Sequence, residues 1–138
     1  VVKIQKGIEF IPQPGMLFVK LPSGRHLAYV KPAWDGRNLA YYGVDQTNKK
    51  WGKIPTYGGK LVENIVQAIA RDCLAVAVAR LDKKGYNIVM HVHDEVVIDA
   101  PATVSLEEIC ALMGQTSSWA TRLRLRADGL VCEYYKKA

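Results

Sequence analysis

The chain has 138 residues, a hydrophobic fraction of 49%, a formal net charge of +6 and a pI near 9.3. This length suits one domain with a buried core. No run of about 18 apolar residues and no signal-peptide pattern occurs, which argues against secretion and membrane insertion. The chain has an odd number of cysteines, and they are widely spaced: Cys73, Cys110 and Cys132. This pattern favours reduced cysteines in the core and argues against a disulfide framework. The positive charge favours a polyanionic partner, although ribosomal, nucleoid and membrane-surface proteins share it.

Short apolar runs separated by prolines and glycines fill the first 55 residues. We predict four strands in an antiparallel meander, near residues 16–20, 26–31, 39–44 and 50–55. Ser23-Gly24 and Asp35-Gly36 are the predicted turns. Residues 1–15 show no clear periodicity and are predicted to form a tail or an adaptor strand. No repeat or change in composition marks a second domain, so we predict a single domain over residues 1–138, β-rich over 1–55.

The spacing of apolar residues changes at Gly59. From there they recur every three or four residues, and the pattern ends at Lys83-Lys84-Gly85, which predicts a long amphipathic helix with cations and a glycine at its C-terminal end. Strands are predicted at 87–92 and 96–100, and Ser105 as the N-cap of a second helix. Trp119 is predicted to anchor the next segment, before a closing strand at 129–135. The predicted fold class is α+β, with an antiparallel sheet, one long helix and a β-hairpin.

Residues 91–99, HVHDEVVID, form the most informative stretch of the chain. Apolar residues on both sides of His93-Asp94-Glu95 predict a β-hairpin with an acidic turn, although the usual Asn-Gly or Asp-Gly pair is missing. Acidic residues at a hairpin tip are often present only because the tip is solvated. A rigid hairpin can also hold two carboxylates within reach of a divalent cation, as phosphoryl-transfer chemistry requires.

A polar stripe follows the long helix. Its members lie at i, i+4, i+7 and i+11 and are Lys60, Asn64, Gln67 and Arg71. Such a stripe is ordinarily the solvated face of an amphipathic helix. Amides and guanidinium groups can also donate to minor-groove acceptors, which all base pairs present in similar places. The stripe therefore also suits a protein that grips a duplex without reading its sequence.

The segment from Thr56 to Pro101 strongly resembles the palm subdomain of the DNA polymerase I family (family A), especially its bacteriophage and prophage branch. In that family a His-Asp-Glu hairpin follows a long helix that carries a functional glutamine, and both occur here in the same order. The resemblance covers the chain from about Leu17 onward. Its further parts are Leu21-Pro22-Ser23-Gly24-Arg25, Tyr42-Gly43-Val44-Asp45, Ala127-Asp128-Gly129 and Tyr134-Tyr135-Lys136-Lys137.

The resemblance implies a DNA-directed DNA polymerase, a nucleotidyltransferase of DNA replication that adds deoxynucleotides to a primer 3′-end by a two-metal mechanism. It implies that Asp94 helps to bind two Mg²⁺ ions, that Glu95 supports this metal site and that His93 lies near the primer terminus. His93 would position phosphate, or be only a structural histidine. The implied partners are primer-template DNA and a deoxynucleoside triphosphate, in the cytoplasm of a bacterial host.

The resemblance also implies that the long helix faces the primer-template minor groove, with Gln67 matching the family's glutamine. Relatives commonly carry an Asn four residues and an Arg eight residues before that glutamine. This chain has Glu63 and Gly59 there, with Asn64 and Lys60 one residue later. Gln67 is therefore the expected DNA contact with the closest match, and Asn64, Lys60 and Arg71 are expected contacts that depart from the family pattern.

Two parts of the family's machinery have no counterpart in this sequence: the second metal-binding aspartate, and the fingers helix that binds the incoming nucleotide. Both normally precede the matched region, and the chain begins at Val1. We therefore expect an excised C-terminal palm piece of a larger polymerase, inactive alone and able to self-associate through apolar surface.

Two other functions are compatible with these residues. A non-catalytic duplex nucleic-acid-binding module would show salt-sensitive affinity without dependence on Asp94 or magnesium. A metal-dependent nuclease would use Asp94, Glu95 and Asp99, although one turn supplies few well-spaced ligands for two metals.

Overall fold

The structure, a computed structural model, describes residues 1–137 and has an α+β fold, which confirms the predicted class. The chain divides into two compact units, Val1–Ile69 and Ala70–Ala138. The elements in chain order are β1 (Val2–Lys3), β2 (Glu9–Gln13), β3 (Met16–Lys20), β4 (His26–Trp34), β5 (Leu39–Val44), β6 (Trp51–Thr56), α1 (Gly58–Lys83), β7 (Asn87–Val92), β8 (Glu95–Asp99), α2 (Leu106–Met113) and the 3₁₀ turn η1 (Ser118–Ala120).

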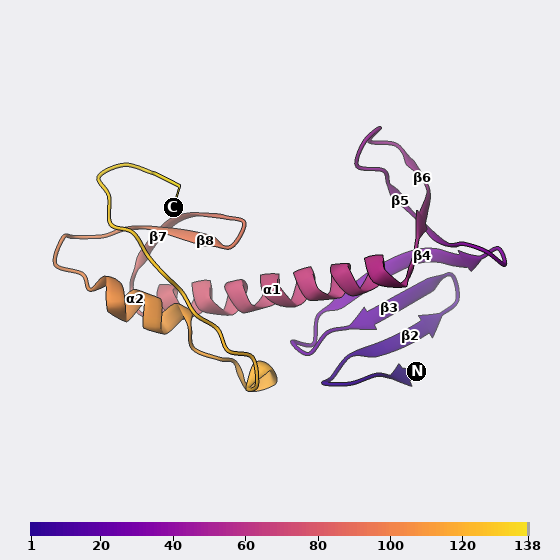
Figure 1. Ribbon diagram of the computed structural model, residues 1–138, viewed down its shortest axis with the longest axis horizontal. Helices are drawn as coiled ribbons and strands as arrows, with labels where there is room; N and C mark the ends of the chain where they lie inside the picture. The colour runs from indigo at the N-terminus through magenta and orange to yellow at the C-terminus, as the bar shows by residue number, and fades with distance from the viewer. Residues whose placement is uncertain (138) are drawn as a thin grey trace. The chain divides into compact units, whose positions relative to one another are not determined.

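The first unit holds a six-stranded antiparallel sheet in the order β1-β2-β3-β4-β5-β6 (Figure 1). This meander confirms the predicted strands β3 to β6 within a few residues. The turns at Ser23-Gly24 and Asp35-Gly36 are also confirmed, and both glycines have positive φ. Residues 1–15 contribute two paired strands where a tail or adaptor strand was predicted. The missed signal is Pro14-Gly15, the two-residue turn that pairs β2 with β3, where Gly15 has φ +72°.

The core of the first unit lies between the sheet and the first half of α1. Val19, Leu21 and Tyr29 from the sheet side pack with Ile65 and Ala68 of the helix, and all five are buried. Alternate residues of each strand face the helix, which is why the apolar periodicity is two in the strands and between three and four in α1. In the turn after β3, Arg25 donates from Nη2 to the carbonyl oxygen of Ala68 at 3.0 Å. This bond fixes the turn to the helix backbone.

The end of α1 agrees with its sequence signals. Arg80 and Lys83 lie in the last turn, where cations favour the helix dipole. The amide of Tyr86 donates to the carbonyl of Leu81, and the amide of Gly85 to that of Asp82. These two bonds form a Schellman cap, which requires the positive φ that Gly85 adopts at +85°.

The second unit contains the end of α1, the two-stranded β7–β8 hairpin and α2. Leu74, Ala77 and Leu81 of α1 and Leu112 of α2 are buried. Ser105 caps α2 as predicted, because its Oγ accepts from the amide of Glu108 at 3.2 Å. Both helices are therefore placed as their capping residues predict.

The predicted closing strand at 129–135 is wrong, because these residues form no strand. Leu130 is 51% and Val131 76% exposed. The segment instead approaches α2, since a Cβ at Gly129 would collide with the side chain of Leu106. All three cysteines are free, and Cys132 is exposed, so the prediction of a core cysteine fails there.

Trp119 lies half-buried in η1, in the segment that it was predicted to anchor. Among residues 1–137, no helix is both long and apolar enough to cross a membrane.

Candidate active site and nucleic-acid interface

The β7–β8 hairpin has a two-residue turn, His93-Asp94, closed by the pair Val92 and Glu95. Glu95 therefore begins β8, one residue earlier than predicted. His93 has φ +53°, in the left-handed region where an L residue is strained but histidine is tolerated better than most. A register shift between Ile88 and Met90 marks a bulge in β7, a feature common beside functional sites.

Asp94 differs from the other aspartates found at turns. Asp35 Oδ1 accepts from the amides of Arg37 at 2.9 Å and Asn38 at 2.7 Å, and Asp45 Oδ1 closes the β5–β6 turn in a similar way. Asp94 is exposed, and among residues 1–137 its carboxylate has no hydrogen-bond or ion-pair partner. Its carboxylate is therefore available for a ligand, whereas those of Asp35 and Asp45 hold their own turns.

Glu95 is held by the C-terminal segment. The hydroxyl of Tyr135 donates to Glu95 Oε2 at 3.3 Å, across 40 residues of sequence. Desolvation raises the pKa of the Tyr135 phenol, and the charge of Glu95 raises it further. Asp94, Glu95, Tyr135 and Lys136 share the lining of an open cavity of about 820 Å³ in the second unit. Carboxylates and a cation therefore face the same space.

The fit of the tip to a metal ion can be judged from its donors. In the part of the chain that is described, no three His, Cys, Asp or Glu side chains come together as a metal site. Asp94 and Glu95 supply hard oxygen donors, and Mg²⁺ commonly takes only one or two protein carboxylates, with water and phosphate filling the rest of its shell. The pair therefore suits half of a magnesium site. Asp99 ends β8 opposite Asn87, at the far end of the strand from the turn, and does not complete a cluster.

His91 contacts the polar stripe. In the second unit, Arg71 Nη1 of α1 lies 3.4 Å from Nδ1 of His91 in β7. Arginine can only donate, so this contact requires His91 to accept at Nδ1 and to carry its proton at Nε2 when neutral. Arg71 was predicted to contact DNA, and here it links the helix to the strand that leads into the hairpin tip.

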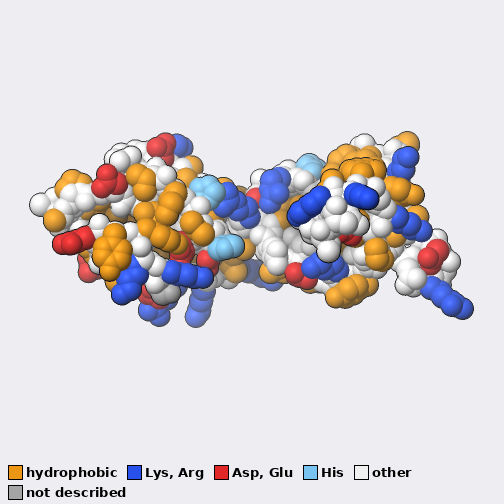
Figure 2. All heavy atoms as spheres, turned by 90° about the horizontal axis from the view of Figure 1, so that it is seen from above, with side chains coloured by type: hydrophobic (Ala, Val, Ile, Leu, Met, Phe, Trp, Pro, Cys, Tyr) orange, Lys and Arg blue, Asp and Glu red, His pale blue; other side chains and the backbone are white. Residues whose placement is uncertain are grey.

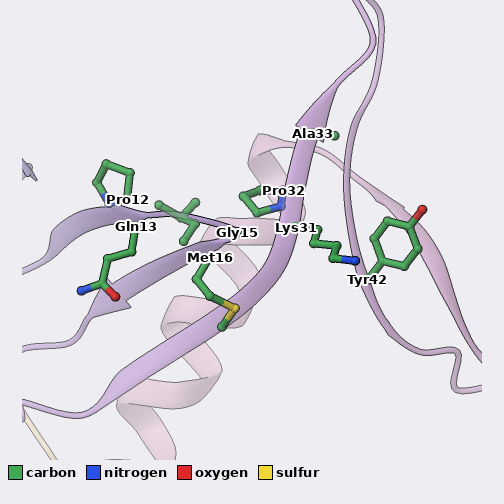
Figure 3. Close-up of a pocket in the computed structure, with 9 residues that line it drawn as sticks. Pro12, Gln13, Gly15, Met16, Lys31, Pro32, Ala33 and Tyr42 are labelled. Carbon is green, nitrogen blue, oxygen red and sulfur yellow. The ribbon is translucent and has the colours of Figure 1, made fainter.

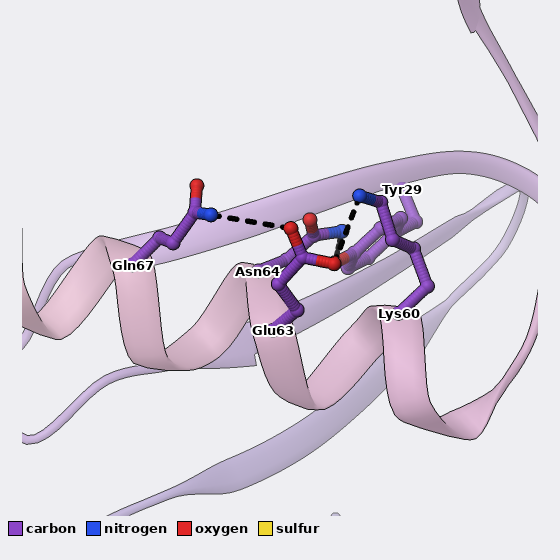
Figure 4. Close-up of polar contacts among 5 residues, drawn as sticks. All are labelled: Tyr29, Lys60, Glu63, Asn64 and Gln67. Atoms are coloured by element: carbon purple, nitrogen blue, oxygen red, sulfur yellow. Dashed lines mark hydrogen bonds and ion pairs between the residues drawn. The ribbon is translucent and has the colours of Figure 1, made fainter.

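In the first unit, a carboxylate joins two of the predicted DNA contacts (Figure 4). Lys60 Nζ lies 2.9 Å from Glu63 Oε2, and Gln67 Nε2 donates to Glu63 Oε1 at 3.2 Å. The hydrogen bond and the charge of Glu63 raise the pKa of the Lys60 ammonium group. The side chains of Lys60 and Glu63 remain 48% and 47% exposed. Lys60 and Gln67 are therefore accessible to solvent, but each must break its bond to Glu63 before it can donate to another acceptor.

Asn64 points toward the sheet instead of solvent. Its Nδ2 donates to the hydroxyl of Tyr29 at 3.1 Å (Figure 4). Burial raises the pKa of the Tyr29 phenol and outweighs the opposite effect of this bond. The prediction of one continuous outward stripe therefore does not hold at Asn64, because this position lies at the edge of the helix face that packs on β4.

Sequence reasoning missed Glu63 as a link between Lys60 and Gln67, although a Glu within four residues of each was a visible signal. It also gave Tyr135 and Lys136 no role. No local pattern could have found these two, because the contact of Tyr135 with Glu95 and the place of Lys136 in the cavity lining depend on the path of the C-terminal segment.

The chain is 53% identical to a DNA polymerase of Bacillus phage SP02 over 142 aligned residues, which cover 99% of this chain and 22% of that polymerase. No protein-family model matches the chain. No solved structure matches it. The chain thus spans about a fifth of the length of the curated relative, and nearly all of it is similar to one segment of a phage DNA polymerase.

Proposed function

We propose that this chain is a palm segment of a family A phage DNA polymerase, which extends a primer in the cytoplasm of its bacterial host. The observation that carries this proposal is the unpartnered carboxylate of Asp94 at a hairpin tip, in the part of the chain that is described. The His93-Asp94-Glu95 order and the similarity to a phage DNA polymerase support it. Substrates would be primer-template DNA and a deoxynucleoside triphosphate.

Asp94 and Glu95 would hold Mg²⁺, which when bound supplies charge stabilisation to the transferring phosphoryl group. Other ligands would have to come from outside residues 1–137, because only two adjacent carboxylates meet at the tip. Tyr135 occupies one oxygen of Glu95 and would thereby limit its rotation. Lys136 lines the same cavity and would attract phosphate.

His93 would act as a positioning donor. Its positive φ places it at the turn beside Asp94, where its ring is exposed. An imidazole N–H can donate to phosphate without coordinating magnesium, which prefers oxygen ligands. The contact between Arg71 and His91 would hold β7 against α1 and so limit movement of the tip.

The exposed part of the helix stripe would contact the duplex. Lys60, Gln67 and Arg71 are exposed and carry donors suited to phosphate oxygens and minor-groove acceptors. Glu63 would oppose this contact, because its carboxylate engages Lys60 and Gln67 and repels phosphate. Asn64 would instead support the helix from the sheet side.

A chimera tests this function. The matched segment of the SP02 polymerase is replaced by this chain, and primer extension and primer-template binding are measured with and without Asp94→Asn. Extension by the chimera, lost in Asp94→Asn with binding retained, is the expected result. Extension that survives Asp94→Asn would contradict the catalytic role. In that case, duplex binding by the 138-residue chain that weakens with salt and ignores magnesium would favour the binding module.

The 138-residue chain alone is expected to give no template-dependent extension, because within residues 1–137 only two adjacent carboxylates meet at the hairpin tip. Detectable extension by the purified chain would contradict this. Self-association of the isolated chain stays a prediction, which sedimentation analysis can check.

A further inference from the structure

One face of the β5–β6 hairpin carries exposed aromatic and basic side chains. The register pairs Tyr42 with Lys53 and Val44 with Trp51, and directly paired residues lie on the same side of an antiparallel ladder. Tyr42 and Val44 are two residues apart, so all four side chains share one face. Tyr42 is 37%, Val44 48% and Trp51 61% exposed. We call this the Trp51 face.

The opposite face of the same hairpin is packed. Tyr41 contacts Tyr29 with ring centroids 4.9 Å apart in an edge-to-face arrangement, and it packs against the buried cluster under α1. Ile54 pairs with Tyr41 on that side. The hairpin is therefore fixed by one face, while large apolar groups on the other remain in water. Such exposure has a solvation cost, which a binding function explains.

Cations border the aromatic groups. Lys31 Nζ lies 5.8 Å from the centroid of the Tyr42 ring, within cation–π range. The amide of Lys31 donates to the carbonyl of Gly15 at 2.7 Å, which fixes this irregular part of β4. Figure 3 shows Lys31 and Tyr42 beside a groove of about 490 Å³ that Met16 and Pro32 also line. The Trp51 face therefore continues into a hollow with a cation at its edge.

The exposed charged side chains of the β5–β6 hairpin are all basic. Lys49, Lys50 and Lys53 are all exposed. The only acidic residue between Leu39 and Thr56 is Asp45, whose Oδ1 accepts from the amides of Thr47 and Asn48 and so closes the turn. Basic and hydrophobic side chains also lie side by side over the unit that contains β1–β6 (Figure 2). The surface is complementary to a polyanion with flat apolar parts.

We propose that the Trp51 face binds single-stranded nucleic acid. Bases would stack on Trp51 and Tyr42, and Lys31 and Lys53 would neutralise phosphates. Aromatic platforms with interleaved cations bind single strands without sequence preference, because every base has a π-face. A duplex hides these faces inside its stack, so the surface prefers a single strand. This site uses residues of the first unit alone and does not depend on Asp94.

The test uses the 138-residue chain and a fluorescein-labelled (dT)12 oligonucleotide at low salt, with anisotropy as the readout. Trp51→Ala is expected to weaken binding about tenfold, and Trp51→Phe to keep most of it. Lys53→Gln is expected to weaken the salt dependence, so that the slope of log affinity against log salt becomes less negative by about 0.7. Trp34→Ala is the matched control. Trp34 is 67% exposed and pairs with Leu39 on the Tyr41 side, so its loss is expected to leave binding unchanged.

Circular dichroism of each variant checks that the fold is kept. Equal affinities of Trp51→Ala and Trp34→Ala, or no binding of (dT)12, would overturn the proposal. Binding of a 12-base-pair duplex that is tighter than binding of (dT)12 and is weakened by Trp51→Ala would overturn it too, whereas duplex binding that Trp51→Ala leaves unchanged belongs to the helix stripe. Self-association abolished by Trp51→Ala without (dT)12 binding would also overturn it and assign the face to a second copy. Asp94→Asn is expected to bind (dT)12 like the wild type even if the chimera test fails, so the two proposals fail separately.

Discussion

The hairpins β5–β6 and β7–β8 each place an aspartate at the turn, and the two aspartates are used differently. Asp45 accepts two backbone amides, from Thr47 at 2.7 Å and Asn48 at 3.0 Å, and so stabilises its own turn. Asp94 accepts none within residues 1–137, and its turn depends instead on a strained His93. A turn residue that gives its own turn no local stabilisation is therefore the better candidate for chemistry.

The largest expected effect separates the two aspartates by activity. In the chimera, Asp94→Asn is expected to lower primer extension by at least about a hundredfold, because an amide is a poor ligand for a divalent cation. Asp45→Asn keeps an acceptor oxygen in the turn and is expected to change extension less than about twofold. Steady-state extension rates at matched magnesium concentrations check both values. Similar losses in both variants would remove the distinction between the hairpins.

Strain at the turns gives a second comparison. His93 has φ +53° and Lys49 has φ +58°, so glycine at either place is expected to stabilise its hairpin by up to about 1 kcal/mol. His93→Gly is also expected to lower extension about tenfold, since the donor is lost, whereas Lys49→Gly is not. Amide exchange of the hairpin strands and extension by the chimera measure the two effects. A gain in stability without lost activity in His93→Gly would make this histidine structural.

The two turn aspartates, Asp45 and Asp94, are also expected to differ in how they affect the pH dependence of stability. The backbone amides of Asn48 and Thr47 hold the pKa of Asp45 below its ordinary 3.8. The contribution of Asp45 to stability is therefore complete above about pH 3.8 and decreases as pH falls through the lowered pKa. Asp45→Asn is expected to remove this decrease. Urea unfolding followed by tryptophan fluorescence at pH 6 and pH 3 checks it, with Asp94→Asn as the control that keeps the decrease.

The smallest expected effect concerns the bond between Tyr135 and Glu95. Tyr135→Phe removes an exposed hydrogen bond to Glu95, and so is expected to raise the magnesium concentration for half-maximal extension twofold to fivefold. A spectrophotometric titration gives a second readout. Glu95→Gln is expected to move the raised pKa of Tyr135 back toward its ordinary 10.0, although only in part, because desolvation is the larger cause. No change in either measurement would mean that the bond has no positioning role.

Elements with local sequence signals could be predicted before the structure was known. The periodicity from Gly59, the glycine at position 85, the cap at Ser105 and the apolar runs around His93-Asp94 each act within a few residues. Backbone capping and side-chain periodicity depend on near neighbours, so these features could be predicted. Of the candidate site, the hairpin and the exposed positions of Lys60, Gln67 and Arg71 could be predicted, but not the inward contact of Asn64 or how the side chains are paired.

Contacts between residues far apart in the sequence depend on the tertiary fold. Asn64 meets Tyr29 and Tyr135 meets Glu95 across 35 and 40 residues of sequence, and no local pattern specifies either pair. Residues 129–135 illustrate the same dependence, because apolar and aromatic residues there favour a strand but the segment forms none. A strand forms only beside another strand, and a polar contact only beside a complementary group. Whether the fold brings such a partner close depends on the packing of the whole unit.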